Sequence, residues 1–516
     1  MFDKSSGTQQ KPFRARSSGS NDKKPSSDRR FARDDRRPSG RPAAPGQRGV
    51  KPGQPFNRDR GSRPAGVTAP RAPGASPARA AALAALSDVL DNGAYTAEAI
   101  DRRLSGTTMA GVDRALCTAL VYGTLENLLA IDHILSFYLE NPDTVEKRVM
   151  NILRMAVCQK EWMDRIPDNA IADEAVRLTR QLGLEKLTGL VNGVVRSFLR
   201  GDRQVTWPED PIERMALQSS MPLWITRTLI MDHGEEKTRA MLTERPEKHD
   251  MVLRPNMTML SDGQFEELLK KKAWDTRRGR VPHAYYASGV MQLDRDRDYL
   301  AGSFSVQGEA SMLAASLACA APGMQVLDCC AAPGGKTAYM AEMMQGTGRV
   351  LAMDIHPHRV ELIRAMARRL RLDNIRPIVW DARKPREEYL DRFDVCLLDA
   401  PCTGLGEWHQ KPDIRYGITE ASLAELKETQ KQLLDTCSAY VRRGGHLVYA
   451  TCSIFRDEND RQVQAFLERH KNYRLCPADE SVRALYPDQD HGCGTQLLPL
   501  SGAGEGFYMA RLKRMD

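Results

Sequence analysis

The sequence predicts four regions: a basic tail at residues 1–78, an all-α bundle at 79–203, a small α+β region at 204–300 and an α/β domain at 301–516. The chain has 516 residues, which is too long for one ordinary core. Apolar residues recur with a helical period between about residues 80 and 201, and strand and helix patterns alternate after about residue 299. The excess of basic residues is confined to the N-terminal tail.

The tail is rich in Arg, Gly, Pro and Ser. Residues 1–80 hold 19 lysines and arginines against 6 aspartates, whereas the rest of the chain has more acidic than basic residues. A segment of this composition cannot bury enough apolar surface to fold. We expect a disordered arm that is attracted to nucleic-acid phosphates. The alternative is a tail that only keeps the protein soluble.

The overall composition excludes several classes of protein. Hydrophobic residues make up 41% of the chain and charged residues 28%, as in soluble globular proteins. No stretch approaches the roughly 18 consecutive apolar residues of a membrane span, and the N-terminus lacks the apolar segment of a secretory signal. The 11 cysteines are irregularly spaced without a C-x-x-C pair, which argues against a disulfide framework and against a zinc site. We therefore expect a cytoplasmic protein without membrane or metal, and a monomer.

The middle of the chain shows no catalytic signature. Helical periodicity predicts helices near residues 81–90, 115–129, 149–157 and 172–182, which together indicate a bundle. In the region at 204–300, residues 251–256 are expected to form a strand and 262–272 an amphipathic helix. Basic residues gather beside Trp274 at Lys270, Lys271, Lys272, Arg277, Arg278 and Arg280. Such a cluster fits a nucleic-acid surface, although a charge run is more often only a solvated face.

Short apolar runs after residue 300 predict strands at 325–329, 349–353, 375–380, 393–398 and 446–450. Helical stretches at 336–344, 357–370 and 421–441 lie between them. This alternation predicts an open parallel sheet covered by helices. A last apolar segment at 506–512 is expected to add a closing edge strand.

A glycine turn follows the first of these strands, in Val326-Leu-Asp-Cys-Cys-Ala-Ala-Pro-Gly-Gly-Lys-Thr337. Glycine lets the backbone approach a ligand closely, and the start of the next helix favours negative charge. Asp354, Asp381 and Asp399 stand at the ends of successive strands, where carboxylates bind ribose hydroxyls and base amino groups. A P-loop would need glycine where Cys330 stands, and the dinucleotide pattern is missing. S-adenosylmethionine is the nucleoside that remains.

Two cysteines, Cys402 and Cys452, follow apolar strands of the same sheet, so both thiols should face one crevice. A thiolate that adds to C6 of cytosine makes C5 nucleophilic enough to accept a methyl group, and loss of the C5 proton and the thiol restores the ring. Asp399 is placed to contact the N3/N4 edge of the base, and Lys336 to supply positive potential. For a single cysteine, the ordinary interpretation is a small buried hydrophobic residue.

These motifs resemble the Nop/Sun family of RNA cytosine-C5 methyltransferases. The similar stretches are Ser305-Val-Gln-Gly-Glu-Ala-Ser311, Leu327 to Thr337, Asp399-Ala-Pro-Cys-Thr-Gly404, Lys411-Pro-Asp413 and Ala450-Thr-Cys-Ser453. Upstream, Val121-Tyr-Gly123, residues 166–176 and residues 189–196 resemble the NusB-like helical RNA-binding fold. The combination resembles the bacterial Sun/Fmu (RsmB-type) branch, which modifies small-subunit 16S ribosomal RNA.

The resemblance implies a Rossmann-like, S-adenosylmethionine-dependent catalytic domain, with the region at 204–300 also binding RNA. It implies that Cys452 is the nucleophile, that Cys402 assists product release and that Asp399 and Lys336 complete the catalytic set. The methyl-donor pocket would comprise Cys330, Ala331, Ala332, Pro333, Gly334, Gly335, Lys336, Asp354, Asp381 and Asp399. The implied partner is ribosomal RNA, either free or within an assembling particle.

The sequence departs from the family pattern at Gly308, where Asp is usual, at Val395, and along Leu405-Gly-Glu-Trp-His409. These departures bear on target choice rather than on the reaction. Three rivals stay open at this point. A DNA cytosine methyltransferase would use Cys402 as nucleophile, a catalytically inactive ribosome-assembly factor would only bind RNA, and a related enzyme would act on tRNA.

Overall fold

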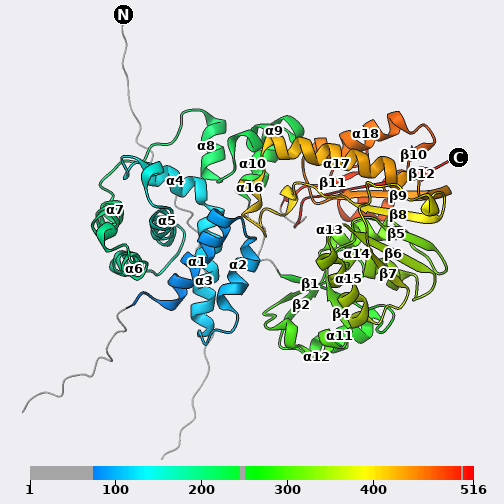
Figure 1. Cartoon of the computed structure of the whole chain (residues 1–516), viewed down its shortest axis with the longest axis horizontal. Helices are drawn as coiled ribbons and strands as arrows, with labels where there is room; N and C mark the ends of the chain where they lie inside the picture. Colours follow the sequence, from blue (N-terminus) through cyan, green and yellow to red (C-terminus); the bar gives the residue numbers. More distant parts are fainter. Residues whose placement is uncertain (1–73, 245–249, 501–503, 516) are drawn as a thin grey trace, which may run out of the picture. The chain divides into compact units, whose positions relative to one another are not determined.

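The computed structural model describes residues 74–244, 250–500 and 504–515 (Figure 1). The predicted disordered tail lies outside the described residues, apart from its last few positions. Helix α1 (Pro77–Asn92) begins two residues before the predicted boundary at 79, because Ser76 caps it and Pro77 suits the first helical position.

A helical bundle follows, as predicted. It is built from α1, α2 (Thr96–Leu104), α3 (Gly111–Glu126), α4 (Leu128–Ser136), α5 (Lys147–Glu161), α6 (Asp168–Gln181) and α7 (Thr188–Arg200). Their apolar faces form one core that includes Leu86, Leu120, Ile152 and Val191. The single helix predicted at 115–129 is two helices, since the chain breaks at Asn127, whose Nδ2 donates to the Gly123 carbonyl.

Within the described ranges, no single helix has the length and apolar character needed to cross a membrane. Helices α3 and α4 have the length and apolar character of a membrane span only when taken together, and they are bent by 73° relative to each other.

The next region joins helices to a small sheet. Helices α8 (Pro211–Gln218), α9 (Leu223–His233) and α10 (Glu235–Thr243) precede β1 (Met251–Pro255), α11 (Asp262–Lys270), β2 (Asp275–Arg278), β3 (Tyr285–Ser288), α12 (Arg297–Leu300) and β4 (Phe304–Val306). In the described chain the sheet order is β2-β3-β1-β4. Strand β4 pairs with β1, so the predicted boundary at 300/301 separates two strands of one sheet.

Most members of the basic cluster of this region have acidic or aromatic partners, and its role as a nucleic-acid surface stays a prediction. Lys272 contacts Asp296 at 2.7 Å and Asp298 at 2.5 Å, and Lys270 contacts Glu267 at 2.6 Å. Arg278 pairs with Glu266, while Arg277 stacks over the Tyr286 ring. Each of these bases therefore has its own acidic or aromatic partner, which sequence spacing did not reveal.

The C-terminal region contains the predicted α/β sheet. In the part of the chain that is described, its order is β10-β12-β9-β8-β5-β6-β7, with β11 also paired to β12. The strands are β5 (Gln325–Asp328), β6 (Arg349–Asp354), β7 (Ile375–Val379), β8 (Phe393–Asp399), β9 (Val441–Thr451), β10 (Tyr473–Leu475), β11 (Thr495–Leu497) and β12 (Phe507–Arg514). The helices are α13 (Glu309–Ser316), α14 (Gly335–Met343), α15 (Pro357–Leu370), α16 (Ile414–Gly417), α17 (Glu420–Ser438), α18 (Asp460–Arg469) and α19 (Glu480–Leu485).

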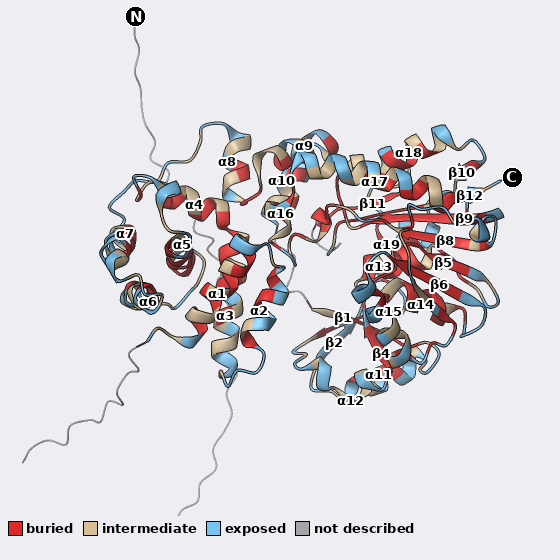
Figure 2. Ribbon diagram, in the orientation of Figure 1, coloured by how far each residue is buried: buried red, intermediate tan, exposed pale blue. Residues whose placement is uncertain are grey.

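The prediction of an open parallel sheet holds for β9, β8, β5, β6 and β7, but the whole sheet is mixed. Strand β12 is not the predicted edge strand, because it runs antiparallel between β9 and β10. The central strands are buried nearly throughout, while helices show exposed outer faces (Figure 2). The sheet is thus covered on both faces, as parallel strands require.

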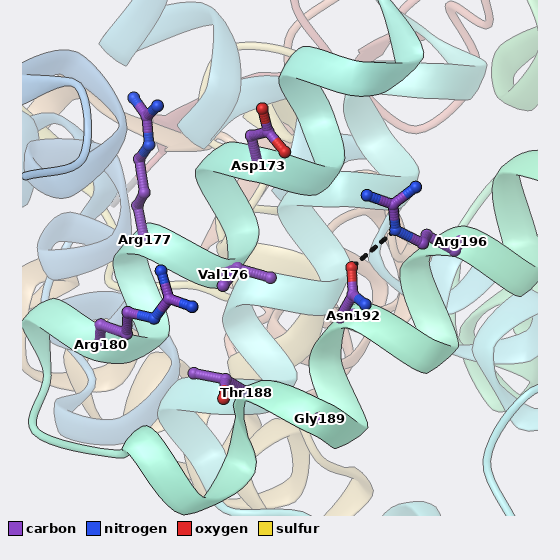
Figure 3. Close-up of a pocket in the computed structure, with 8 residues that line it drawn as sticks. All are labelled: Asp173, Val176, Arg177, Arg180, Thr188, Gly189, Asn192 and Arg196. Atoms are coloured by element: carbon purple, nitrogen blue, oxygen red, sulfur yellow. Dashed lines mark hydrogen bonds between the residues drawn. The ribbon is translucent and has the colours of Figure 1, made fainter. Parts of the chain in front are cut away.

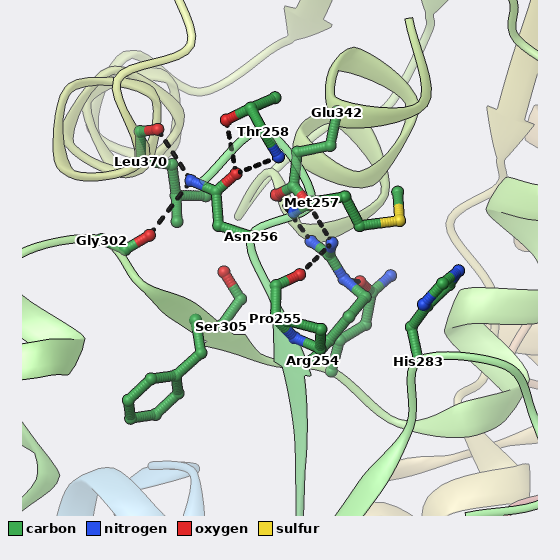
Figure 4. Close-up of polar contacts among 12 residues, drawn as sticks. Arg254, Pro255, Asn256, Met257, Thr258, His283, Gly302, Ser305, Glu342 and Leu370 are labelled. Atoms are coloured by element: carbon green, nitrogen blue, oxygen red, sulfur yellow. Dashed lines mark hydrogen bonds and ion pairs between the residues drawn. The ribbon is translucent and has the colours of Figure 1, made fainter. Parts of the chain in front are cut away.

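A buried ion pair joins the small sheet to helix α14 (Figure 4). Arg254 of β1 contacts Glu342 of α14, with Nη2 and Oε1 3.1 Å apart, and both side chains are fully buried. Arg254 also donates to Gln307 and lies 4.3 Å from the Tyr339 ring centre. Directly after β1, the Asn256 amide donates to the carbonyls of Gly302 and Leu370. These contacts hold the small sheet against helices α14 and α15, which pack on the large sheet.

Candidate active site

The glycine turn connects β5 to α14 as predicted. Gly334 has φ of +110°, a conformation that favours glycine, and a Cβ atom there would lie 3.4 Å from Cα of Ile363 in α15. Thr337 in the first turn of α14 donates to Asp328 Oδ2 at 2.6 Å, which ties the helix to the end of β5. The other oxygen of the buried Asp328 carboxyl has no hydrogen-bond partner among the described residues.

A cavity of about 330 Å³ lies beyond the carboxyl ends of β5, β6 and β8. Seven of the predicted site residues line it: Cys330, Ala332, Asp354, Asp381, Asp399, Cys402 and Cys452. The other five, Ala331, Pro333, Gly334, Gly335 and Lys336, are not among its lining residues. Sequence reasoning did not single out the apolar part of the wall, to which Ile355, Trp380, Ala382 and Leu433 contribute.

The three strand-end aspartates have different partners. Asp354 accepts from the His356 backbone at 3.0 Å and lies 3.5 Å from the Arg359 guanidinium. Arg383 donates to both oxygens of Asp381, and this hydrogen bonding holds the pKa of that carboxyl below its usual range. Asp399 accepts from Lys336 Nζ at 2.8 Å. Of the three, Asp381 therefore presents a charged carboxylate to the cavity at neutral pH.

Cys402 and Cys452 meet at this cavity, with their Sγ atoms 3.5 Å apart. Their strands β8 and β9 are parallel neighbours in which Asp399 stands opposite Ala450. Cys402 follows Asp399 by three residues and Cys452 follows Ala450 by two, so strand register brings the thiols together. The hydrogen bond with Cys452, followed by burial, raises the pKa of Cys402 well above its ordinary value. Cys402 therefore holds its proton at neutral pH.

Two lysines supply positive charge near Cys452. Burial works against the Lys336 ammonium, yet Asp399 and the charge on Cys452 raise its pKa above the usual value. For Lys411, burial is likewise outweighed by Glu407 and by Cys452, so its pKa is raised too. Both ammonium groups therefore face the negative charge that Cys452 carries when it acts as a nucleophile. The sequence predicted this role for Lys336 but not for Lys411.

The buried carboxylate of Glu458 links the two cysteine loops, and sequence reasoning missed it. Its Oε1 accepts the Thr403 backbone N–H at 2.9 Å, and its Oε2 accepts the Thr403 hydroxyl at 2.6 Å. Oε2 also accepts the Ser453 hydroxyl, and Gln430 donates to Oε1 at 2.9 Å. Thr403 and Ser453 directly follow Cys402 and Cys452, so one acid positions both thiols. The sequence shows only that an acidic residue stands six positions after Cys452, which by itself does not predict this contact.

The departures from the family pattern have structural explanations. A Cβ atom at Gly308 would lie 2.7 Å from Glu505 Oε2, so the Glu505 carboxyl occupies the space that a side chain there would need. Val395 is buried in β8, and Leu405 and Trp408 are buried in a core cluster. At Gly406 a Cβ atom would lie 1.9 Å from the Gly506 carbonyl oxygen, while the Gly406 N–H donates to the Cys452 carbonyl at 2.9 Å.

A second cavity of about 490 Å³ adjoins Cys402. Its lining includes Thr403 and Asp413 together with residues 93–95, and Asp413 accepts from the Thr96 hydroxyl at 2.5 Å. Cys402 lines both cavities. Across the described residues, no group of three or more His, Cys, Asp or Glu side chains is arranged to hold a metal ion.

The chain is similar in sequence and fold to known proteins. The family described as 16S rRNA methyltransferase RsmB/F matches residues 316–513, and the NusB family matches residues 76–200. A probable ribosomal RNA small subunit methyltransferase B from Bacillus subtilis is 31% identical over 439 residues, covering 84% of this chain and 98% of the relative. Ribosomal RNA small subunit methyltransferase B from Yersinia enterocolitica is 32% identical over 446 residues, covering 84% and 98%.

The crystal structure of PH0851 is similar in fold, with a TM-score of 0.73 and 23% identity over 85% of this chain and 99% of that one. Fold and site together define a Rossmann-like methyltransferase domain preceded by a NusB-like helical domain. Given the relatives that match it over most of their length, the chain belongs to the RsmB/F family of 16S rRNA methyltransferases.

Proposed function

We propose that the chain is an S-adenosylmethionine-dependent RNA (cytosine-C5) methyltransferase that forms 5-methylcytosine in 16S ribosomal RNA. The observation that carries this proposal is the 3.5 Å separation of the Cys402 and Cys452 sulfurs beside a cavity lined by three carboxylates. The membership of the RsmB/F family supports the ribosomal RNA substrate.

The cavity residues fit the methyl donor. Its volume of about 330 Å³ is within the usual range for small-ligand sites. Asp354 would accept hydrogen bonds from ribose hydroxyls, and the apolar wall around Trp380 would pack against the adenine. Asp381 would contact the adenine amino group while keeping its ion pair with Arg383. When bound, S-adenosylmethionine supplies an electrophilic methyl group.

Cys452 acts as the nucleophile. Its thiolate, stabilised by the Lys336 and Lys411 ammonium groups, adds to C6 of the cytosine and forms the C6–Sγ bond. The electron pair of the former C5–C6 double bond then makes C5 nucleophilic, and C5 accepts the methyl group. Asp399, held by Lys336, hydrogen-bonds the N3/N4 edge of the base, and a proton delivered to N3 at this contact neutralises the negative charge that thiolate addition places on the ring.

Cys402 assists the release of Cys452 from C6 of the methylated base. Water takes the C5 proton, the C6–Sγ bond breaks and the ring double bond returns. Cys402 keeps its own proton, so its S–H can donate to the departing Cys452 sulfur 3.5 Å away. That hydrogen bond stabilises the leaving thiolate and speeds product release.

Methyl transfer from radiolabelled S-adenosylmethionine tests this function. Unmodified 16S rRNA, free or in assembling subunits, should accept label that co-migrates with 5-methylcytidine after nuclease digestion. Cys452→Ala should abolish transfer, while Cys319→Ser, at an exposed cysteine outside both cavities, should retain it. Label on tRNA or DNA instead would overturn the substrate assignment, and no transfer to any nucleic acid would leave an RNA-binding assembly factor.

A further inference from the structure

A polar groove lies between α6 and α7 of the helical bundle, outside the site described above (Figure 3). Its volume is about 470 Å³, and its lining comprises Asp173, Val176, Arg177 and Arg180 of α6 with Thr188, Gly189, Asn192 and Arg196 of α7. Guanidinium groups stand on both sides, since Arg177 and Arg180 lie on one wall and Arg196 on the other.

The arginines of the groove are only partly compensated. Arg177 forms an ion pair with Glu174 at 3.3 Å. Arg196 donates to the neutral Asn192 amide oxygen at 2.8 Å, and Arg180 is exposed. Among the residues that the structure describes, no carboxylate forms an ion pair with Arg180 or Arg196, and Asp173 is the one acid in the lining. The groove therefore carries a net positive charge.

Glycines on α7 leave the helix backbone open to a ligand. A Cβ atom at Gly189 or at Gly193, one turn later, would have nothing within 4 Å. Glycine inside a helix costs about 1 kcal/mol relative to alanine, and at Gly193 no packing contact explains it. An accessible backbone flanked by arginines suits a polyanion that lies along the helix.

We propose that this groove binds the phosphodiester backbone of the RNA substrate, which rests on the proposed function. Arginine presents a planar fork of donors that matches phosphate oxygens in pairs. A protein partner would need an apolar centre, but Val176 is the one aliphatic residue among the lining residues. The lining has no aromatic side chain for base stacking, so the groove contributes affinity rather than sequence choice.

Binding of a 16S rRNA fragment to the full chain, measured by fluorescence anisotropy over a range of salt concentrations, tests this proposal. The double variant Arg180→Gln with Arg196→Gln removes two charges that form no ion pair, so folding should be unaffected. Affinity should fall about tenfold or more, and the slope of log K against log salt should become shallower by about 1.4, the value for two phosphates on a single strand.

A second variant blocks the groove without changing charge. Gly189→Leu projects into open space and improves helix propensity, and it should weaken RNA binding and raise the KM for RNA while kcat stays unchanged. The matched control is Lys147→Gln with Arg148→Gln, which removes two exposed charges from the same bundle away from the groove. This control should shift affinity far less.

Equal affinity and salt slope for the groove variants and the control would overturn the proposal, as would tighter binding of an acidic protein than of RNA at this groove. A different result would overturn the proposed enzymatic function without overturning the groove. If the wild-type chain binds RNA through Arg180 and Arg196 but transfers no methyl group, the groove stands and the enzymatic assignment falls.

Discussion

The sulfur atoms of Cys402 and Cys452 lie 3.5 Å apart, although 50 residues separate them in the sequence. Parallel pairing of β8 with β9 creates this proximity, and the buried Glu458 holds the two following residues. The distance allows a hydrogen bond between a thiol and a thiolate, so the two sulfurs can differ in protonation and in role.

Glu458→Ala should uncouple the two loops. The change leaves the Thr403 N–H and Gln430 amide without their acceptor, which costs about 1–3 kcal/mol per group, and frees both cysteines. We expect kcat for methyl transfer to fall at least tenfold with a small change in KM for RNA. Glu458→Gln should restore part of the activity. Glu468→Ala, an exposed acid of α18, is the control; equal kcat values for Glu458→Ala and this control would refute the positioning role.

Lys336→Met should lower the rate of methyl transfer because it removes a positive charge while keeping a side chain of similar length. The variant removes the ammonium that contacts Asp399 at 2.8 Å and that favours negative charge on Cys452. The rate at saturating RNA should drop, because the ammonium that contacts Asp399 and faces Cys452 is gone. Since the pKa of Lys336 is raised above its usual value, the wild-type profile should show no loss from this lysine between about pH 6 and 9. A rate at saturating RNA equal to that of the wild type would contradict this account.

Asp328 should make the protein less stable as the pH rises through the weakly acidic range. Burial raises the pKa of this carboxyl to about 7 in the folded state, above the ordinary value of about 3.9. The unfolded chain therefore releases this proton first, and stability is lost between about pH 4 and pH 7. Asp328→Asn should remove up to about 4 kcal/mol of this dependence in urea unfolding. If the unfolding free energies of variant and wild type changed equally with pH, this role of Asp328 would be disproved.

Removing only one partner of the Arg254–Glu342 ion pair should greatly lower the free energy of unfolding. Glu342→Ala leaves a fully buried guanidinium without its carboxylate, and we expect a loss of about 3–5 kcal/mol in unfolding free energy. Arg254→Met combined with Glu342→Leu should recover much of that loss, since an apolar pair needs no compensation. A double variant as unstable as the single one would show that the pair itself, rather than the stranded charge, sets the stability.

Sequence patterns predicted the parallel core and most of the cavity because both depend on local signals. Apolar runs give the strands, and strand ends gather Asp354, Asp399, Cys402 and Cys452 at one edge. Nonlocal pairing was harder to predict. The interior position of β12 depends on antiparallel partners far away in the sequence, and Lys272 meets carboxylates that lie 24 and 26 residues further along the chain. Glu458 and Lys411 act through tertiary contacts that no spacing rule reveals.

The most direct measurement is the detection of the covalent protein–RNA bond on denaturing gels. Cys402→Ala, incubated with radiolabelled S-adenosylmethionine and 16S rRNA, should accumulate a labelled adduct that nuclease shortens and protease releases. Cys452→Ala and the Cys402→Ala/Cys452→Ala double variant should form none. An adduct that persists in Cys452→Ala and disappears in Cys402→Ala would contradict the assignment of Cys452 as nucleophile.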